Sequence, residues 1–120
     1  MRNTVNWFEL FVSDMPRAAA FYEQVLATRL KVAPFNGEPH AIFSDDGVAG
    51  ALVQREGKKP SSEGSLVYLN CDGVLDEALG RVEKAGGKIV MPKTDIGPPG
   101  FIAIVRDTEG NSVGLHSERR

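Results

Sequence analysis

Cysteine is almost absent from this chain of 120 residues, because Cys71 is the only one. A single cysteine excludes an intrachain disulfide and any metal centre built from several thiolates. The sequence also lacks an apolar run of about 18 residues, so we expect no membrane-spanning helix. Acidic and basic residues nearly balance, 16 against 14, which removes the electrostatic argument for nucleic acid or an anionic membrane as a partner.

Motifs for several common enzyme chemistries are missing as well. The sequence contains no Walker loop, no dinucleotide-binding glycine motif and no nucleophile triad. The first four residues run directly into a strand pattern and lack the apolar core of a signal peptide. Together with the lone cysteine, this leads us to expect a cytoplasmic protein.

What the chain does contain is an internal repeat. Residues 7–14 align without gaps on residues 65–72, at a spacing of 58, and each stretch leads from a strand-like segment through an Asp into a helix-like segment. Duplicated units usually place a site between the two copies. A polar segment rich in Gly, Pro and Ser separates the copies. We therefore expect one domain over residues 1–120, made of a first module over 1–56, a linker over 57–64 and a second module over 65–120.

Hydrophobic periodicity predicts the same order of elements, βαβββ, in both halves. In the first half we expect a strand over 5–12, a helix from Ser13 or Asp14 to Ala27 with Pro16 in its first turn, a strand over 30–33, a loop over 34–39, a strand over 41–44, a turn at 45–47 and a strand over 48–54. In the second half we expect a strand over 65–70, a helix over 74–85 ended by Gly86 and Gly87, and strands over 88–92, 101–106 and 112–116. Such tandem repeats give an α+β fold with two four-stranded sheets around a shared cleft and helices outside.

Alternation within the first strand predicts which side chains are buried. Phe8, Leu10 and Val12 should face the helix, whereas the odd-numbered residues should face the cleft. The predicted core contains apolar residues from both halves, namely Phe8, Leu10, Val12, Phe21, Val25, Leu66, Val82, Val113 and Leu115.

Three motifs carry a family resemblance. Residues 12–26 are similar to the pattern V-x-D-x-x-R-A-x-x-F-Y-x-x-V-L, residues 85–87 read A-G-G, and residues 107–111 are similar to a D-P-D/E-G-N turn with Thr108 in place of Pro. With the βαβββ duplication, these motifs resemble the vicinal oxygen chelate superfamily, which includes glyoxalase I, bleomycin-resistance proteins and extradiol dioxygenases. Residues 7–10 together with residues 113–115 look like the subgroup that is called lactoylglutathione lyase-related.

The resemblance also implies where a metal would be held. Members with a metal bind it through four His, Glu or Gln side chains on the inner faces of four strands. Carried over to this sequence, those positions fall on Trp7, Ala51, Ser65 and Gly114. An indole, a methyl group, a hydroxyl and a bare glycine do not make a site for a divalent metal. We therefore expect the fold without its metal, no cofactor and no glyoxalase I activity.

Two ionisable residues are the candidates for catalysis, and each lies two residues from a carried-over position. Glu9 could orient a ligand or act as a base, or it could be an ion-paired glutamate at a strand end. His116 could carry a proton, or it could be a partly exposed histidine near the C-terminus. Trp7 could stack on a planar ligand or fill the space of the metal. The residues expected to line the ligand site are Trp7, Phe11, Ser65, Phe101 and Gly114.

Two functions remain open at the level of sequence. One is an enzyme of this superfamily that acts on a small organic molecule without a metal. The other is a non-catalytic module that sequesters a drug or a metabolite. The exposed strand edges and inner faces need cover, and family members of this size commonly build a cleft across a dimer interface. The expected partners are therefore a small molecule and a second copy of the chain, with no role for nucleic acid or membrane.

Overall fold

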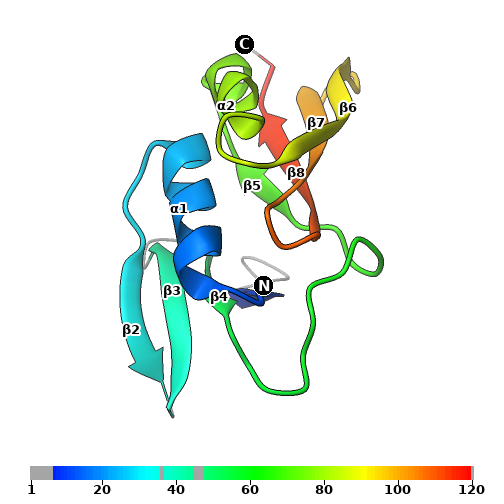
Figure 1. Cartoon of the computed structure of the whole chain (residues 1–120). Coiled ribbons are helices and arrows are strands. Elements are labelled where there is room, and N and C mark those ends of the chain that lie inside the picture. Colours follow the sequence, from blue (N-terminus) through cyan, green and yellow to red (C-terminus); the bar gives the residue numbers. More distant parts are fainter. Residues whose placement is uncertain (1–6, 36, 45–47, 120) are drawn as a thin grey trace.

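The computed structural model describes residues 7–35, 37–44 and 48–119. Figure 1 shows two sheets, one from each half of the chain, with one helix packed against each. Both sheets have four strands, in the orders β1-β4-β3-β2 and β5-β8-β7-β6. This arrangement confirms the predicted α+β fold of tandem βαβββ repeats. The predicted turn at 45–47 and the first two residues of the first predicted strand lie outside the described residues.

The two modules repeat the same elements in the same order. The first contains β1 (Trp7–Phe11), α1 (Met15–Leu26), β2 (Lys31–Phe35), β3 (Glu38–Ser44) and β4 (Ala49–Val53). The second contains β5 (Tyr68–Asn70), α2 (Leu75–Val82), β6 (Lys88–Asp95), β7 (Phe101–Arg106) and β8 (Ser112–Ser117). In both modules the first strand pairs in parallel with the last, and the remaining neighbours are antiparallel. None of the helices in the described ranges is long and apolar enough to cross a membrane.

Helix α1 begins and ends where the sequence predicts. Asp14 is the N-cap, and its carboxylate accepts a hydrogen bond from the amide of Arg17 at 3.0 Å. Pro16 lies in the first turn, where a missing N–H has no cost. The helix ends at Ala27, which adopts the left-handed conformation with φ 52°.

The core lies between each helix and its sheet. Phe21 and Tyr22 of α1 are both 1% exposed, and their rings meet edge to face with centroids 4.9 Å apart. Of the residues predicted for the core, all but one are buried or packed against the buried cluster. The exception is Leu66, which is 37% exposed, so its placement in the core is wrong.

The reason for this error is a one-residue shift in the alignment of the two halves. The amide of Val12 donates to the carbonyl of Val53 at 3.0 Å, and the amide of Cys71 donates to the carbonyl of His116 at 2.7 Å. These equivalent bonds give a spacing of 71 − 12 = 59 between the first strands, not 58. Since side chains alternate along a strand, one residue of slip exchanges the two faces. Val67, Leu69 and Cys71 are therefore the residues of this segment that pack on the core.

Other strand boundaries also differ from the prediction. The segment 34–39 is not a loop, because β2 and β3 pair as far as Phe35 and Glu38 and leave only residues 36–37 between them. Its two prolines are loop signals, but Pro34 lies in the edge strand β2, where proline is accommodated, and Pro39 lies near the start of β3. Strand β5 begins at Tyr68, three residues later than expected, and β6 continues to Asp95.

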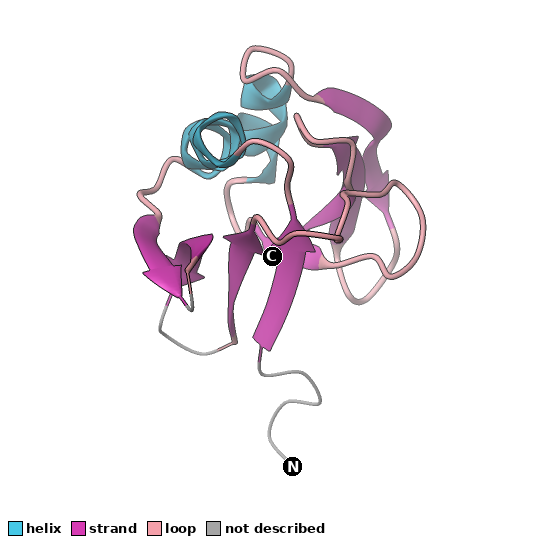
Figure 2. Ribbon diagram, turned by 60° about the horizontal axis from the view of Figure 1, so that its bottom comes forward, coloured by secondary structure: helices cyan, strands magenta, loops and turns pink. Residues whose placement is uncertain are grey.

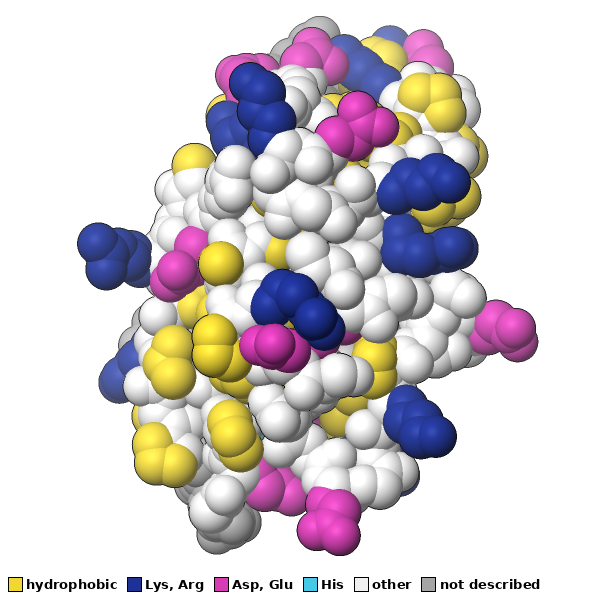
Figure 3. Space-filling view, viewed as in Figure 1, with side chains coloured by type: hydrophobic (Ala, Val, Ile, Leu, Met, Phe, Trp, Pro, Cys, Tyr) yellow, Lys and Arg dark blue, Asp and Glu magenta, His cyan; other side chains and the backbone are white. Residues whose placement is uncertain are grey.

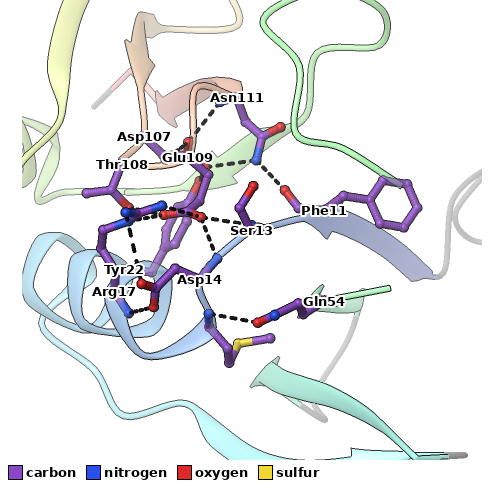
Figure 4. A network of polar contacts seen from close by, with 11 residues as sticks. Phe11, Ser13, Asp14, Arg17, Tyr22, Gln54, Asp107, Thr108, Glu109 and Asn111 are labelled. Atoms are coloured by element: carbon purple, nitrogen blue, oxygen red, sulfur yellow. Dashed lines mark hydrogen bonds and ion pairs between the residues drawn. The ribbon is translucent and has the colours of Figure 1, made fainter. Parts of the chain in front are cut away.

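A polar clamp joins the two modules (Figure 4). The turn at residues 107–111 lies against the start of α1, and the carboxylate of Glu109 accepts bonds from the amides of Ser13 at 2.8 Å and Asp14 at 2.9 Å. Arg17 adds an ion pair at 2.8 Å. Burial raises the pKa of Glu109, but these donors and the hydroxyl of Thr108 outweigh it and lower the pKa to about 2.

Two buried side chains complete this clamp. The hydroxyl of Tyr22 donates to Asp107 at 2.7 Å, and burial together with the charge of Asp107 raises the pKa of Tyr22 well above 10. The amide of Asn111 donates to the carbonyl of Phe11 at 2.8 Å. Helices α1 and α2 also contact each other, and Figure 2 shows them side by side above the strands. The motif at 107–111 therefore fixes how the modules sit together.

Candidate functional site

Most of the candidate site residues lie on the faces of the two sheets that turn away from the helices. On β1, Trp7, Glu9 and Phe11 share this face, and Glu9 is in register with Ala51 of β4. With the corrected spacing, the residue of β5 equivalent to Glu9 is Tyr68, which is in register with Gly114 of β8. The two modules thus present equivalent positions with very different side chains.

In the first module this face holds a charged cluster. One oxygen of Glu9 pairs with Arg55 at 3.2 Å, and the other accepts a long hydrogen bond from the indole of Trp7 at 3.4 Å. Arg55 also pairs with Glu38 at 2.9 Å and lies 5.8 Å from the centre of the Phe11 ring. Glu9 is therefore ion-paired, and its side chain is still 28% exposed.

His116 has a specific structural contact in the second module. Its Nε2 lies 2.7 Å from the carbonyl oxygen of Pro99. A carbonyl can only accept, so Nε2 carries the proton of this hydrogen bond. The same contact holds the loop at residues 96–100 against β8, and Arg119 adds a bond to the carbonyl of Gly97 at 3.2 Å.

Tyr68 is the residue of this face that the sequence analysis missed. A Cβ added to Gly114 would lie 2.3 Å from the ring of Tyr68, so the ring lies directly over this glycine. Tyr68 is nevertheless 44% exposed, the same fraction as Trp7. The signal was present in the sequence, because aligning the two halves at a spacing of 59 makes Tyr68 the equivalent of Glu9. The spacing of 58 instead made Ser65 the equivalent of Trp7 and so placed Ser65 on the face turned away from the helices.

The remaining two predicted site residues are not with this group. Ser65 is exposed and precedes β5 without belonging to a strand. Phe101 is in register with Ser117, so its side chain lies on the helix-facing side and packs against the core. Lys93 and Arg119 lie over its ring, 4.8 and 4.7 Å from the centre. Phe101 also lines a separate cavity of about 230 Å³ at the start of α2.

Comparison with known proteins identifies the family. The sequence model of the glyoxalase/bleomycin resistance protein/dioxygenase superfamily matches residues 4–115. The chain belongs to this superfamily. Among curated proteins it is similar to "Putative glyoxylase CFP32" of Mycobacterium bovis and of Mycobacterium tuberculosis, with 27% identity to each over 99% of this chain and 47% of theirs. The chain thus spans about half the length of these relatives.

Solved structures of the superfamily share the fold. A glyoxalase/bleomycin resistance protein from Albidiferax ferrireducens T118 has a TM-score of 0.74 at 15% identity, over 98% of this chain and 100% of that one. A superfamily enzyme from Burkholderia phytofirmans PsJN has a TM-score of 0.72 at 14% identity, over 95% and 98%. At these identities the likeness concerns the fold.

The donor set in this chain does not fit the metal of the superfamily. The positions carried over from metal-binding members hold Trp7, Ala51, Ser65 and Gly114, and the space beside Gly114 is filled by the Tyr68 ring. The corrected spacing of 59 replaces Ser65 by Leu66, whose apolar side chain is not a ligand of a divalent metal. Within the described ranges no three His, Cys, Asp or Glu side chains are grouped to hold an ion.

Proposed function

We propose that this protein binds a small organic molecule on the sheet faces turned away from the helices, and that it does so without the superfamily metal or any other cofactor. The supporting observation is that two half-exposed aromatic residues, Trp7 and Tyr68, occupy these faces together with Glu9 and His116. Small-molecule sites usually combine apolar and aromatic surfaces with a few placed polar groups. A cytoplasmic location remains part of this proposal.

Binding without chemistry is the version that the contacts favour. Glu9 is held by Arg55 and Trp7, and His116 is held by Pro99, so both candidate catalytic groups already serve a structural contact. A drug- or metabolite-sequestering protein needs no free base. The catalytic alternative, which is not a glyoxalase I reaction, would require Glu9 or Nδ1 of His116 to accept a proton from the substrate.

A second copy of the chain is the other partner in this proposal. The large apolar side chains that remain exposed include Trp7, Leu66 and Tyr68, all from β1 or the segment that contains β5. Exposed apolar faces and unpaired sheet edges are the features that dimer formation covers. We expect a homodimer in solution, and light scattering at micromolar concentration will measure it. A monomeric mass would contradict this part of the proposal.

A thermal-shift screen with small metabolites and aromatic drugs tests the binding function. A compound that binds only the folded state raises the unfolding midpoint. The same compounds are then tested for turnover with the wild type, Glu9→Gln and His116→Asn. Binding without turnover identifies a sequestering protein, whereas turnover that either substitution abolishes identifies an enzyme. If no compound of any chemical class raises the midpoint, the proposed function is wrong.

A further inference from the structure

The ring of Tyr68 lies against Gly114, the residue paired with it on β8. Three of its ring carbons lie 2.3, 2.5 and 2.8 Å from the position that a Cβ of Gly114 would occupy. Only glycine leaves this space free, because real Cβ atoms do not approach other atoms so closely. Part of the ring therefore lies over Gly114 of β8, and Tyr68 is nevertheless 44% exposed.

A similar contact occurs in the equivalent strand pair of the first module, where the ring belongs to the core. A Cβ added to Gly50 would lie 2.3 Å from the ring of Phe8, which is the neighbour of Gly50 in the parallel pair β1 and β4. The ring of Phe8 continues into the core and lies 5.6 Å from that of Phe43. Stabilising the sheet explains Phe8, but it does not require the outward exposure of Tyr68.

The surroundings of Tyr68 are apolar along β7 and polar along β8. Ile104 is in register with Gly114, and Ile102 with His116, so both isoleucines lie on the same face as the ring. His116 lies two residues beyond Gly114 on this face, about 7 Å along the strand. A molecule resting on the ring would therefore meet aliphatic side chains on one side and an imidazole at one end.

We propose that Tyr68 is the stacking surface of the site and that the ligand is a planar aromatic molecule. This inference rests on the proposed function, and it names the ligand class. A flat ring system gains from stacking on an exposed aromatic face beyond the contact area that it buries. Gly114, at a position where metal-binding relatives carry a ligand, serves here to place the ring.

Matched ligands and matched variants test this inference. The ligands are 1-naphthol and decahydro-1-naphthol, which share a carbon skeleton and a hydroxyl but differ in planarity. Their dissociation constants are measured by NMR titration of the full chain. The variants are Tyr68→Leu and Gly114→Ala. The control is Phe8→Leu, which also removes an aromatic ring that lies over a glycine, but on the helix-facing side of the first sheet.

We expect the wild type to bind 1-naphthol about tenfold more tightly than its saturated analogue. Tyr68→Leu should remove this preference, and Gly114→Ala should weaken 1-naphthol binding by displacing the ring. Phe8→Leu should lower the unfolding midpoint and leave the preference unchanged. Should Gly114→Ala fail to fold, Tyr68→Leu alone decides the question.

Three results would overturn the inference. The first is equal affinity of the wild type for the two naphthols, and the second is a preference for 1-naphthol that survives Tyr68→Leu. The third is a change from dimer to monomer in Tyr68→Leu with unchanged affinity, which would make Tyr68 an interface residue. In each case the proposed function still stands if other compounds raise the midpoint in the thermal-shift screen, so the two failures are distinguishable.

Discussion

Ala27 shows how a single residue can carry conformational strain. Among the described residues it is the one non-glycine position with a positive φ, at 52°. Its amide donates to the carbonyl of Glu23 and so closes the end of α1. The left-handed conformation costs an alanine roughly 1 kcal/mol, because its Cβ crowds the following carbonyl.

Replacing Ala27 by glycine should therefore stabilise the protein. We expect Ala27→Gly to raise the free energy of unfolding by about 0.5–1 kcal/mol, measured by urea denaturation. Ala20→Gly is the control, since Ala20 is exposed in the middle of the same helix and glycine there should cost about 1 kcal/mol. Equal destabilisation by both substitutions would show that Ala27 is not strained.

Prediction from this sequence succeeds for residues whose structure is set locally and fails for residues whose structure is set by a distant strand. The N-cap was predicted as Ser13 or Asp14, with Pro16 in the first turn, and Asp14 is the cap, because a helix start depends on local chemistry that the neighbouring residues reveal. The face on which Tyr68 lies depends on its register with β8, some 46 residues away. Apolar residues occur at 66, 67, 68 and 69, so alternation cannot decide which of them face the core.

At the scale of elements, Phe21 packs α1 into the core and against the second module. This side chain is 1% exposed, and its ring fills the space beside Gly87, which immediately precedes β6. Phe21→Ala should lower the free energy of unfolding by roughly 3–5 kcal/mol, because it leaves a cavity in a close-packed core. A loss below about 1 kcal/mol in chemical denaturation would contradict this packing.

The clamp between the turn at 107–111 and α1 should make stability depend on pH. The pKa of Glu109 is lowered to about 2 in the folded protein, whereas an unfolded glutamate titrates near 4.5. The stabilisation by its charge is therefore complete above about pH 4.5 and is lost as the pH falls towards 2. We expect Glu109→Gln to lower the free energy of unfolding by on the order of 2 kcal/mol at pH 7, since it removes the 2.8 Å ion pair with Arg17.

Comparing variants across pH isolates this effect. The difference between wild type and Glu109→Gln in urea denaturation should shrink between about pH 4.5 and pH 2, where the wild-type carboxylate takes up its proton. Glu77→Gln is the control, because Glu77 is exposed on α2 and its substitution should change stability by less than about 0.5 kcal/mol. A difference that is constant over this range would mean that the charge of Glu109 does not support the clamp.

Periodicity predicted the order of the elements, but it did not predict that β2 and β3 pair along residues 34–39. Its strands contain Pro34 and Pro39, which face each other across the pair, and Gly37 lies between the strands. All three are turn signals when considered alone. Pairing with β4 on the far side of β3 holds this segment extended, and such a long-range contact is invisible in a local window.

At the scale of the whole molecule, the duplicated sequence predicted two sheets, but it did not show how they are joined. The contacts that fix the modules come from Glu109, Asp107 and Asn111, which lie about 90 residues from their partners along the chain. In the view of Figure 3, acidic and basic side chains are scattered among each other over the visible face. This mixture agrees with the near balance of charge in the sequence.

The metal content of the purified protein is the property that most sharply separates it from the metal-dependent members of its superfamily. We expect no stoichiometric transition metal and no glyoxalase I activity. A divalent ion needs several nitrogen or oxygen donors at about 2.0–2.2 Å. Two of the carried-over positions hold Ala51 and Gly114. Tyr68 is paired with Gly114 in the sheet, and its ring fills the space beside that glycine. Glu9 is already occupied by Arg55.

Elemental analysis after gentle purification measures this property, and an assay for glyoxalase I with added zinc or nickel measures its consequence. Without a metal, the enediolate of a glyoxalase reaction lacks its main electrostatic stabiliser, so added metal should restore no activity. The matched variant is Gly114→Glu combined with Tyr68→Ala, which returns a carboxylate to β8 and removes the ring that blocks it. About one equivalent of zinc, nickel, iron or manganese in the wild type, removed by a chelator together with activity, would instead assign Glu9 and His116 as metal ligands.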